Sequence, residues 1–224
     1  FSSRRRHTRL LTVTGVQTCA LPILGLGFFL NFGLAGVKSV MSETDAKLFL
    51  DLKLHDIPNT VAGAATAIAA AKPDFLTVHA AGGTAMISAA VNALPSVNIT
   101  AVTILTSLSN SDVSAIGFTS DALTSAVGLA QLATTAGARA IVCSPLEVSA
   151  IRSQLGKTPI VITPGVRPLN DQGSDDQQRT MTPKEAISSG ATYVVIGRPI
   201  TGSWPQGASA MRDKARSIAD EILN

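Results

Sequence analysis

Three charged side chains lie close together around the end of an otherwise apolar segment. Asp51 and Lys53 interrupt the run 48–54, and Asp56 follows just beyond it. Residues two apart on a β-strand point to the same face, so a carboxylate and an ammonium are expected side by side. Because burying an unpaired charge is costly, this pairing predicts either a structural ion pair or a site for chemistry. The third charge and the turn 58–60 favour a site.

The longer string around these charges is Asp-x-Lys-x-x-Asp-Ile-Pro-Asn-Thr, residues 51–60. It resembles the active-site signature of the orotidine 5'-phosphate decarboxylase family. The resemblance implies an enzyme that decarboxylates orotidine 5'-monophosphate to UMP in pyrimidine biosynthesis. The shorter pattern Asp-x-Lys-x-x-Asp is shared with Mg²⁺-dependent sugar-phosphate decarboxylases and aldolases of the same superfamily, which form the alternative. His55 and the segment 57–60 favour the first reading.

The resemblance also implies roles for the residues of the signature. Lys53 would donate a proton to C6 of the pyrimidine ring, and Asp51 would hold Lys53 in place beside the departing carboxylate. Asp56 and Thr60 would reach the active site of a neighbouring subunit, so a homodimer is expected. Neither a metal nor an organic cofactor is implied.

Further candidates follow other predicted strands, where barrel enzymes place their chemistry. A long polar segment, 170–180, resembles the family's mobile loop that grips the phosphate. The resemblance implies that five residues outside the signature contact the substrate: Thr106 at the base or ribose, Arg167 at the base of the long loop, Gln177 towards its end, and Gly197 and Arg198 at the phosphate. The backbone N–H of Gly197 and the guanidinium fork of Arg198 suit phosphate oxygens.

Short apolar runs alternate with alanine-rich stretches, which predicts an α/β fold built on a parallel sheet. Strands are expected at 48–54, 75–79, 100–105, 140–143, 159–163 and 193–196, and helices at 34–41, 61–71, 84–94, 121–136, 146–155, 183–189 and 208–223. Six strands are two short of a (β/α)8 TIM barrel. We therefore expect residues 24–224 to form a single barrel domain that lacks native strand 1, helix 1 and most of strand 2. His79, at the end of a strand, is expected to be structural.

Residues 1–23 differ in character from the rest of the chain. They contain no acidic residue. Residues 20–23 are what the codons GCT-CTT-CCG-ATC would encode, and that nucleotide string resembles a common sequencing-library adapter. We expect this segment to be translated adapter sequence. Arg4–Arg6 and the apolar run after them also imitate a secretory signal, and 20–37 imitates a marginal membrane span. A non-catalytic secreted or membrane-anchored protein is therefore a third hypothesis, which Pro22 and Asn31 disfavour.

Without residues 1–23 the chain has 14 basic and 15 acidic residues, a net charge of −1. This balance gives no reason to expect nucleic-acid binding. One cysteine, Cys143, remains outside the segment, so neither an internal disulfide nor a cysteine zinc site is expected. A reducing, cytoplasmic location fits best, with no membrane partner.

The sequence departs from the family pattern at two positions. The family has an Asp after strand 1 and a Lys after strand 2; the place of the Lys is taken by Ile23, and the Asp has no counterpart. Loss of an ammonium from a partly buried charge array leaves carboxylates under-compensated, at a cost of several kcal/mol. We therefore expect this chain to be impaired relative to an intact family member.

Overall fold

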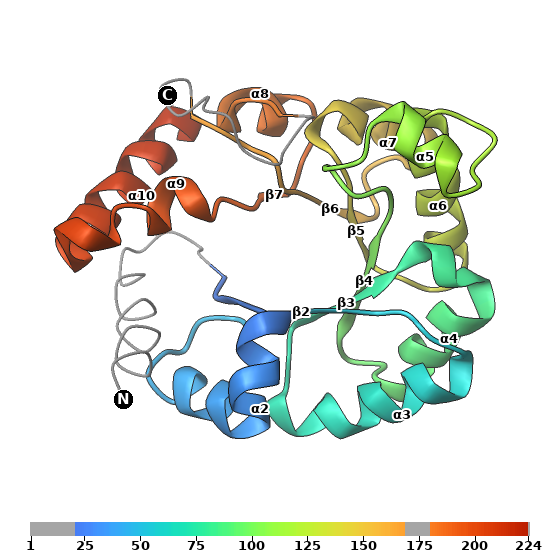
Figure 1. The fold of residues 1–224 in the computed structure, drawn as a ribbon, viewed down its shortest axis with the longest axis horizontal. Coiled ribbons are helices and arrows are strands. Elements are labelled where there is room, and N and C mark those ends of the chain that lie inside the picture. The colour runs from blue at the N-terminus through green and yellow to red at the C-terminus, as the bar shows by residue number, and fades with distance from the viewer. Residues whose placement is uncertain (1–20, 169–179, 224) are drawn as a thin grey trace.

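The computed structural model describes residues 21–168 and 180–223 (Figure 1). Seven parallel strands lie side by side in the order of the sequence. They are β1 (Ile23–Gly25), β2 (Phe49–Leu54), β3 (Phe75–His79), β4 (Asn98–Val102), β5 (Ala140–Val142), β6 (Ile160–Thr163) and β7 (Tyr193–Val194). The sheet curls into a partial barrel, with β1 and β7 at its two ends.

Helices cover the outer face of this sheet (Figure 1). They are α2 (Leu26–Met41), α3 (Pro58–Ile68), α4 (Gly83–Ala93), α5 (Asn110–Ala115), α6 (Ala122–Thr135), α7 (Val148–Leu155), α8 (Pro183–Ser188), α9 (Arg198–Thr201) and α10 (Ala208–Leu223). Several begin with the expected chemistry: the Thr182 hydroxyl accepts the Glu185 N–H at the start of α8, with Pro183 in the first turn.

Alternating side chains of the strands build two apolar layers. Outward-facing residues such as Leu50 and Leu76 are fully buried and pack in one large cluster with the helices. Inward-facing residues form a smaller cluster inside the curl of the sheet. There Phe49 stacks on Phe75 with ring centroids 5.6 Å apart, and Phe75 meets the edge of Tyr193 at 6.0 Å. The inner cluster is a packed floor beneath the ends of the strands.

The parallel α/β barrel architecture predicted from the sequence is confirmed, and all six predicted strands are present. The strand predicted at 100–105 is β4, which begins two residues earlier, at Asn98, and ends three residues earlier, at Val102. Beyond that end, the backbone N–H and the hydroxyl of Thr103 both donate to the Val142 carbonyl. The three-residue β1 was not predicted as a strand, and it supplies the end of the expected second strand. The short helices α5 and α9 were also missed.

The N-terminal prediction falls mostly outside the described residues, which begin at Leu21. Helix α2 starts eight residues earlier than predicted and is interrupted at Gly33, whose φ of 55° is non-helical. Within residues 21–168 and 180–223, no helix combines the length and the apolar character needed to cross a membrane.

The outer layer should carry much of the stability. Leu76 is fully buried in β3, whereas Ile116, just after α5, is 60% exposed. We expect Leu76→Ala to lower the free energy of unfolding by about 2–5 kcal/mol, because it removes buried contacts and leaves a cavity. Ile116→Ala should change it by less than about 0.5 kcal/mol. Urea unfolding of both variants measures the difference, and equal effects would contradict this assignment of the core.

Candidate active site

Strand β2 is irregular where the charged residues lie. Leu50 pairs with Leu76 and Leu54 with Val78, so three residues of β2 stand opposite the single residue Thr77 of β3. Lys53, within this bulge, has a φ of 48°. A left-handed conformation costs a non-glycine residue roughly 1–3 kcal/mol and persists only where the surroundings enforce it. Bulges of this kind re-aim side chains next to active sites.

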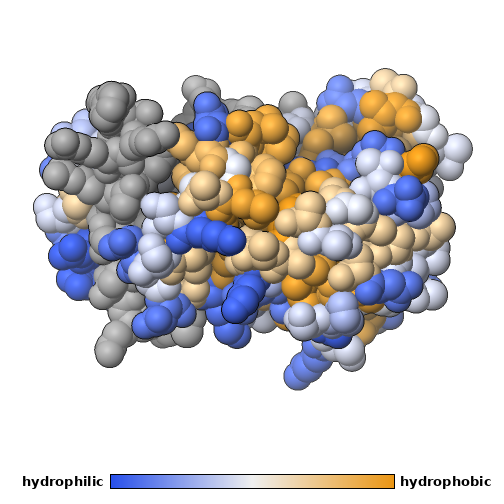
Figure 2. All heavy atoms as spheres, turned by 90° about the horizontal axis from the view of Figure 1, so that it is seen from below, coloured by the Kyte–Doolittle hydropathy of each residue, from blue (hydrophilic) through white to orange (hydrophobic). Residues whose placement is uncertain are grey.

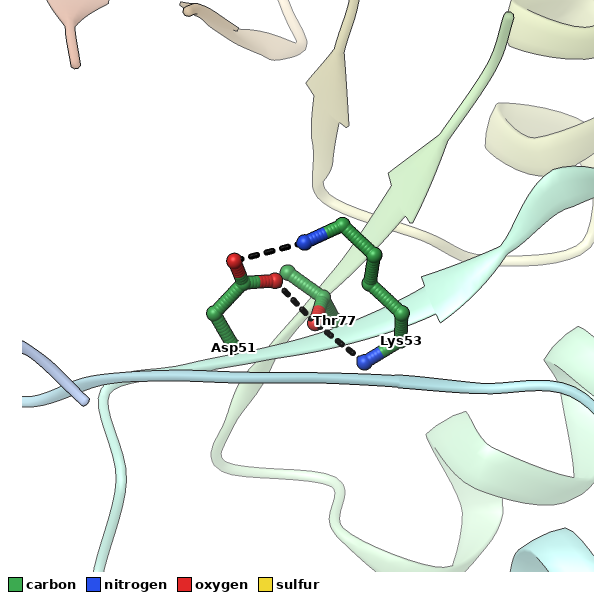
Figure 3. A network of polar contacts seen from close by, with 3 residues as sticks. All are labelled: Asp51, Lys53 and Thr77. Carbon is green, nitrogen blue, oxygen red and sulfur yellow. Dashed lines mark hydrogen bonds and ion pairs between the residues drawn. The ribbon is translucent and has the colours of Figure 1, made fainter. Parts of the chain in front are cut away.

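The bulge brings Asp51 and Lys53 together, as the sequence predicted. Lys53 Nζ lies 2.6 Å from Asp51 Oδ2, and the Thr77 hydroxyl donates to the other carboxylate oxygen, Oδ1, at 2.9 Å (Figure 3). The same hydroxyl accepts the backbone N–H of Lys53 at 2.8 Å. The Lys53 and Asp51 side chains are 38% and 24% exposed, so the ion pair remains open to a ligand.

A pocket opens over this pair at the carboxyl ends of the strands, the end where barrel enzymes bind substrates. Asp51 and Lys53 line it together with Thr106, a third predicted contact residue. Ile23, at the position where the family resemblance expects a lysine, also lines it. The remaining wall residues, which the sequence did not single out, are mostly apolar: Phe49, Val102, Ile104, Leu105, Ser107, Val142, Cys143, Pro164 and Val195.

Two residues of the signature point elsewhere within this chain. Asp56 and Thr60 are exposed and do not line the pocket. Asp56 Oδ1 accepts the backbone N–H of Ile57 at 2.6 Å, just before α3 begins. Their predicted contribution to a site would therefore have to be made outside the pocket of their own chain.

The candidate phosphate residues follow two strands of the pocket wall. Pro164 and Val195 line the pocket, and the chain continues from them to Arg167 and to Gly197. Arg167 is only 8% exposed, and its guanidinium donates to the Val166 carbonyl at 2.9 Å. Arg167 is therefore a buried cation in this structure.

Gly197 and Arg198 are exposed at the start of α9. Nothing lies within 4 Å of the place where a Cβ would stand on Gly197, so the space beside its backbone is open. Gln177 lies outside the described residues. Neither Gly197 nor Arg198 is part of the pocket wall around the ion pair.

Two histidines stand beside the charge pair. The rings of His55 and His79 are 5.3 Å apart. Burial lowers the pKa of His79 below its ordinary value of 6.5; the neighbouring charges of His55 and Lys53 act in the same direction, and Asp51 opposes them. Among the described residues, no three His, Cys, Asp or Glu side chains cluster as a metal site would require.

The lowered pKa of His79 predicts a dependence of stability on pH. The unfolded chain binds a proton on this histidine at higher pH than the folded chain does. Its contribution to stability is therefore present above about pH 6.5 and is lost as the pH falls towards the lowered pKa. NMR titration of the imidazole should give a midpoint below 6.5 that rises in His55→Gln. A midpoint at or above 6.5 would contradict the assignment.

Comparison with known proteins agrees with the signature. A sequence model of the orotidine 5'-phosphate decarboxylase / HUMPS family matches residues 23–212. The orotidine 5'-phosphate decarboxylase of Thermobifida fusca (strain YX) is 50% identical over 187 residues, covering 84% of this chain and 80% of that protein. That of Anaeromyxobacter sp. (strain K) is 47% identical over 196 residues, covering 87% and 85%.

The fold agrees as well. The crystal structure of orotidine 5'-phosphate decarboxylase from Lactobacillus acidophilus superposes with a TM-score of 0.76 at 34% identity, covering 90% of this chain and 86% of that one. Sequence, fold and the placing of Asp51 and Lys53 therefore lead to one assignment: the chain belongs to the orotidine 5'-phosphate decarboxylase / HUMPS family.

Proposed function

We propose that this chain is a carboxy-lyase whose site is built to convert orotidine 5'-monophosphate to UMP in pyrimidine biosynthesis. The observation that carries the proposal is the Asp51–Lys53 ion pair on the wall of a mostly apolar pocket at the carboxyl end of the sheet. The names of relatives with 44–50% identity support it. They also disfavour the alternative of an Mg²⁺-dependent sugar-phosphate enzyme.

In the proposed reaction the bond between C6 of the pyrimidine and its carboxylate breaks. Carbon dioxide leaves, the electron pair stays on C6, and Lys53 Nζ delivers the proton that completes UMP. Lys53 then regains a proton from solvent, which its 38% exposed side chain can reach. Positioned proton transfer of this kind contributes about 10²–10⁴-fold to a rate. Asp51 holds the ammonium in place from 2.6 Å and adds to the field at the reacting carbon.

The remaining predicted residues are proposed to contact other parts of the substrate. Thr106, on the pocket wall, would contact the base or ribose. Arg167, Gln177, Gly197 and Arg198 would hold the phosphate, far from the bond that breaks. Binding energy gathered at a remote group can be used to stabilise the transition state. The open space beside the Gly197 backbone and the exposure of Arg198 agree with this role.

Ile23 is expected to lower the catalytic activity of this site. It lines the pocket beside Asp51 and Lys53, and β1 pairs in parallel with β2 so that Gly25 stands opposite Asp51. An aliphatic side chain there supplies no positive charge to the carboxylates of the enzyme and the substrate. We therefore propose that turnover by this chain is slow because one ammonium is missing from the array.

The first test follows the loss of absorbance of orotidine 5'-monophosphate in the presence of EDTA. Ile23→Lys should raise kcat/KM at least tenfold, about 1.4 kcal/mol of transition-state stabilisation. Ile23→Met, which changes the side chain without adding charge, should not. Adding Lys53→Met to Ile23→Lys should return the rate to background. An activity that appears only with Mg²⁺ would favour the sugar-phosphate alternative instead.

A homodimer is the second part of the proposal. Asp56 and Thr60 are exposed and lie outside their own pocket, as expected of residues that serve a neighbouring site. Ile57, between them, is 66% exposed. Figure 2 shows apolar side chains gathered across the middle of one face of the molecule. Helix α2 lies on this side in Figure 1, and its Leu26 and Leu30 are 50% and 75% exposed. Contiguous apolar surface of this kind marks interaction sites.

Sedimentation velocity tests the dimer. Ile57→Lys should shift the protein from dimer to monomer, because it places a charge within the exposed segment 55–60 that the proposal assigns to the contact. Leu146→Lys changes a residue of similar exposure (51%) on a different part of the surface and should leave the dimer intact. A monomeric parent protein, or a dimer that survives Ile57→Lys, would count against this interface.

We also propose a cytoplasmic location. Cys143, the one cysteine among the described residues, is buried, and a chain with so few cysteines suits a reducing compartment.

A further inference from the structure

Thr77 occupies a special place opposite the bulge of β2. It is the one residue of β3 between the pairs Leu50–Leu76 and Leu54–Val78, so it faces the three residues that carry the charge pair. The Thr77 side chain is 1% exposed and is not part of the pocket wall. A group this deeply buried does not touch a substrate, and any effect it has on the reaction must pass through its neighbours.

The two hydrogen bonds of its hydroxyl have fixed directions. The Lys53 N–H can only donate, so Thr77 Oγ1 accepts from it at 2.8 Å. An ionised carboxylate can only accept, so the single proton of the hydroxyl goes to Asp51 Oδ1 at 2.9 Å. One hydroxyl therefore joins the backbone of the lysine to the side chain of the aspartate (Figure 3).

Each bond restrains a different degree of freedom. The bond to the Lys53 N–H gives this amide a partner where the regular pairing of β2 with β3 is interrupted. It also stabilises the left-handed conformation of Lys53, whose φ is 48°. The bond to Asp51 Oδ1 fixes the rotation of the carboxylate, so that Oδ2 is directed at Lys53 Nζ. Without the hydroxyl, neither the backbone of Lys53 nor the orientation of the Asp51 carboxylate is held in place by Thr77.

We propose that Thr77 is a positioning residue that holds Lys53 and Asp51 in the geometry needed for proton transfer. Its effect on turnover rests on the decarboxylation proposed above, whereas its effect on the Lys53 backbone does not. Positioned groups lose large factors in rate when displaced by about 1 Å, so the hydroxyl should be visible in kcat.

The neighbouring strand offers a matched control. Thr100 of β4 stands opposite Thr77 in the register of the sheet and is fully buried. Its hydroxyl donates to the Asn98 carbonyl at 2.8 Å rather than to Asp51 or Lys53, and Thr100 does not line the pocket. Thr77→Val and Thr100→Val thus each remove one buried hydroxyl while keeping the shape of the side chain, but only the first removes a bond to Asp51 and Lys53.

Amide hydrogen exchange is the first readout. In Thr77→Val, exchange of the Lys53 N–H should accelerate at least tenfold relative to the amides of β3, whereas Thr77→Ser, which keeps the hydroxyl, should retain most of the protection. Thr100→Val should leave the Lys53 amide unchanged. Unchanged exchange of the Lys53 amide in Thr77→Val would overturn the proposal. An equal acceleration along β2 and β3 in both valine variants would also overturn it, because that result indicates a general loosening of the sheet.

Steady-state kinetics is the second readout. Thr77→Val should lower kcat at least tenfold with KM changed less than threefold, and Thr77→Ser should recover most of the rate. A kcat unaffected by Thr77→Val would overturn the catalytic part. If the parent protein shows no decarboxylation at all, the proposed function fails, while the exchange rate of the Lys53 amide still decides whether Thr77 positions the pair.

Discussion

The site depends on a mismatch between two neighbouring strands. Between its flanking pairs, β2 has three residues where β3 has one, so the excess must leave the regular ladder. The chain accommodates it by a bulge in which Lys53 takes a left-handed conformation. That conformation is costly, and it is retained where nearby groups supply compensating bonds. The Asp51–Lys53–Thr77 network is this compensation, and it also creates the reactive pair.

The apolar layers on the two faces of the sheet stabilise the protein enough to retain this strained and charged bulge. Leu50 and Leu52 anchor β2 to the helices, while Phe49 and Phe75 stack inside the barrel beneath the charges. A rigid apolar floor fixes the strand ends and lowers the local dielectric, which strengthens electrostatic interactions above it. The pair itself stays partly open, so the protein does not bear the full desolvation penalty of a buried ion pair.

Much of this architecture could be predicted from the sequence, because local patterns determine it. The run 75–79 was placed correctly as a strand, since apolar β-formers fill it. The helix predicted at 183–189 agrees with α8 to within one residue, because Thr182 and Pro183 define its start. The three residues of β1 were too few to produce a pattern of their own. The end of β4 was misjudged, because apolar residues continue beyond the point where the Thr103 hydroxyl bonds to Val142.

The site could be predicted in part. Period-two spacing placed Asp51 and Lys53 on one face, but it gave no sign of the bulge, which arises from the register of β2 against β3. Thr77 was missed because a threonine in a strand is ordinary; the only signal was a polar residue facing the predicted pair from the next strand. The burial of Arg167 could not be predicted either, because its sequence neighbours do not determine how deeply a charged side chain lies. The roles proposed for Asp56 and Thr60 would depend on a second subunit, which the fold of one chain does not describe.

The proposed site has Lys53, held by the bulge, at the reacting carbon and the phosphate at the Gly197–Arg198 turn. A crystal structure of the protein with UMP bound would test both placements. Lys53 Nζ should lie within roughly 3.5 Å of C6, Asp51 should still be bonded to Thr77, and the phosphate should lie beside the Gly197 N–H and the Arg198 guanidinium. UMP bound with C6 remote from Lys53, or with its phosphate away from that turn, would contradict the proposal.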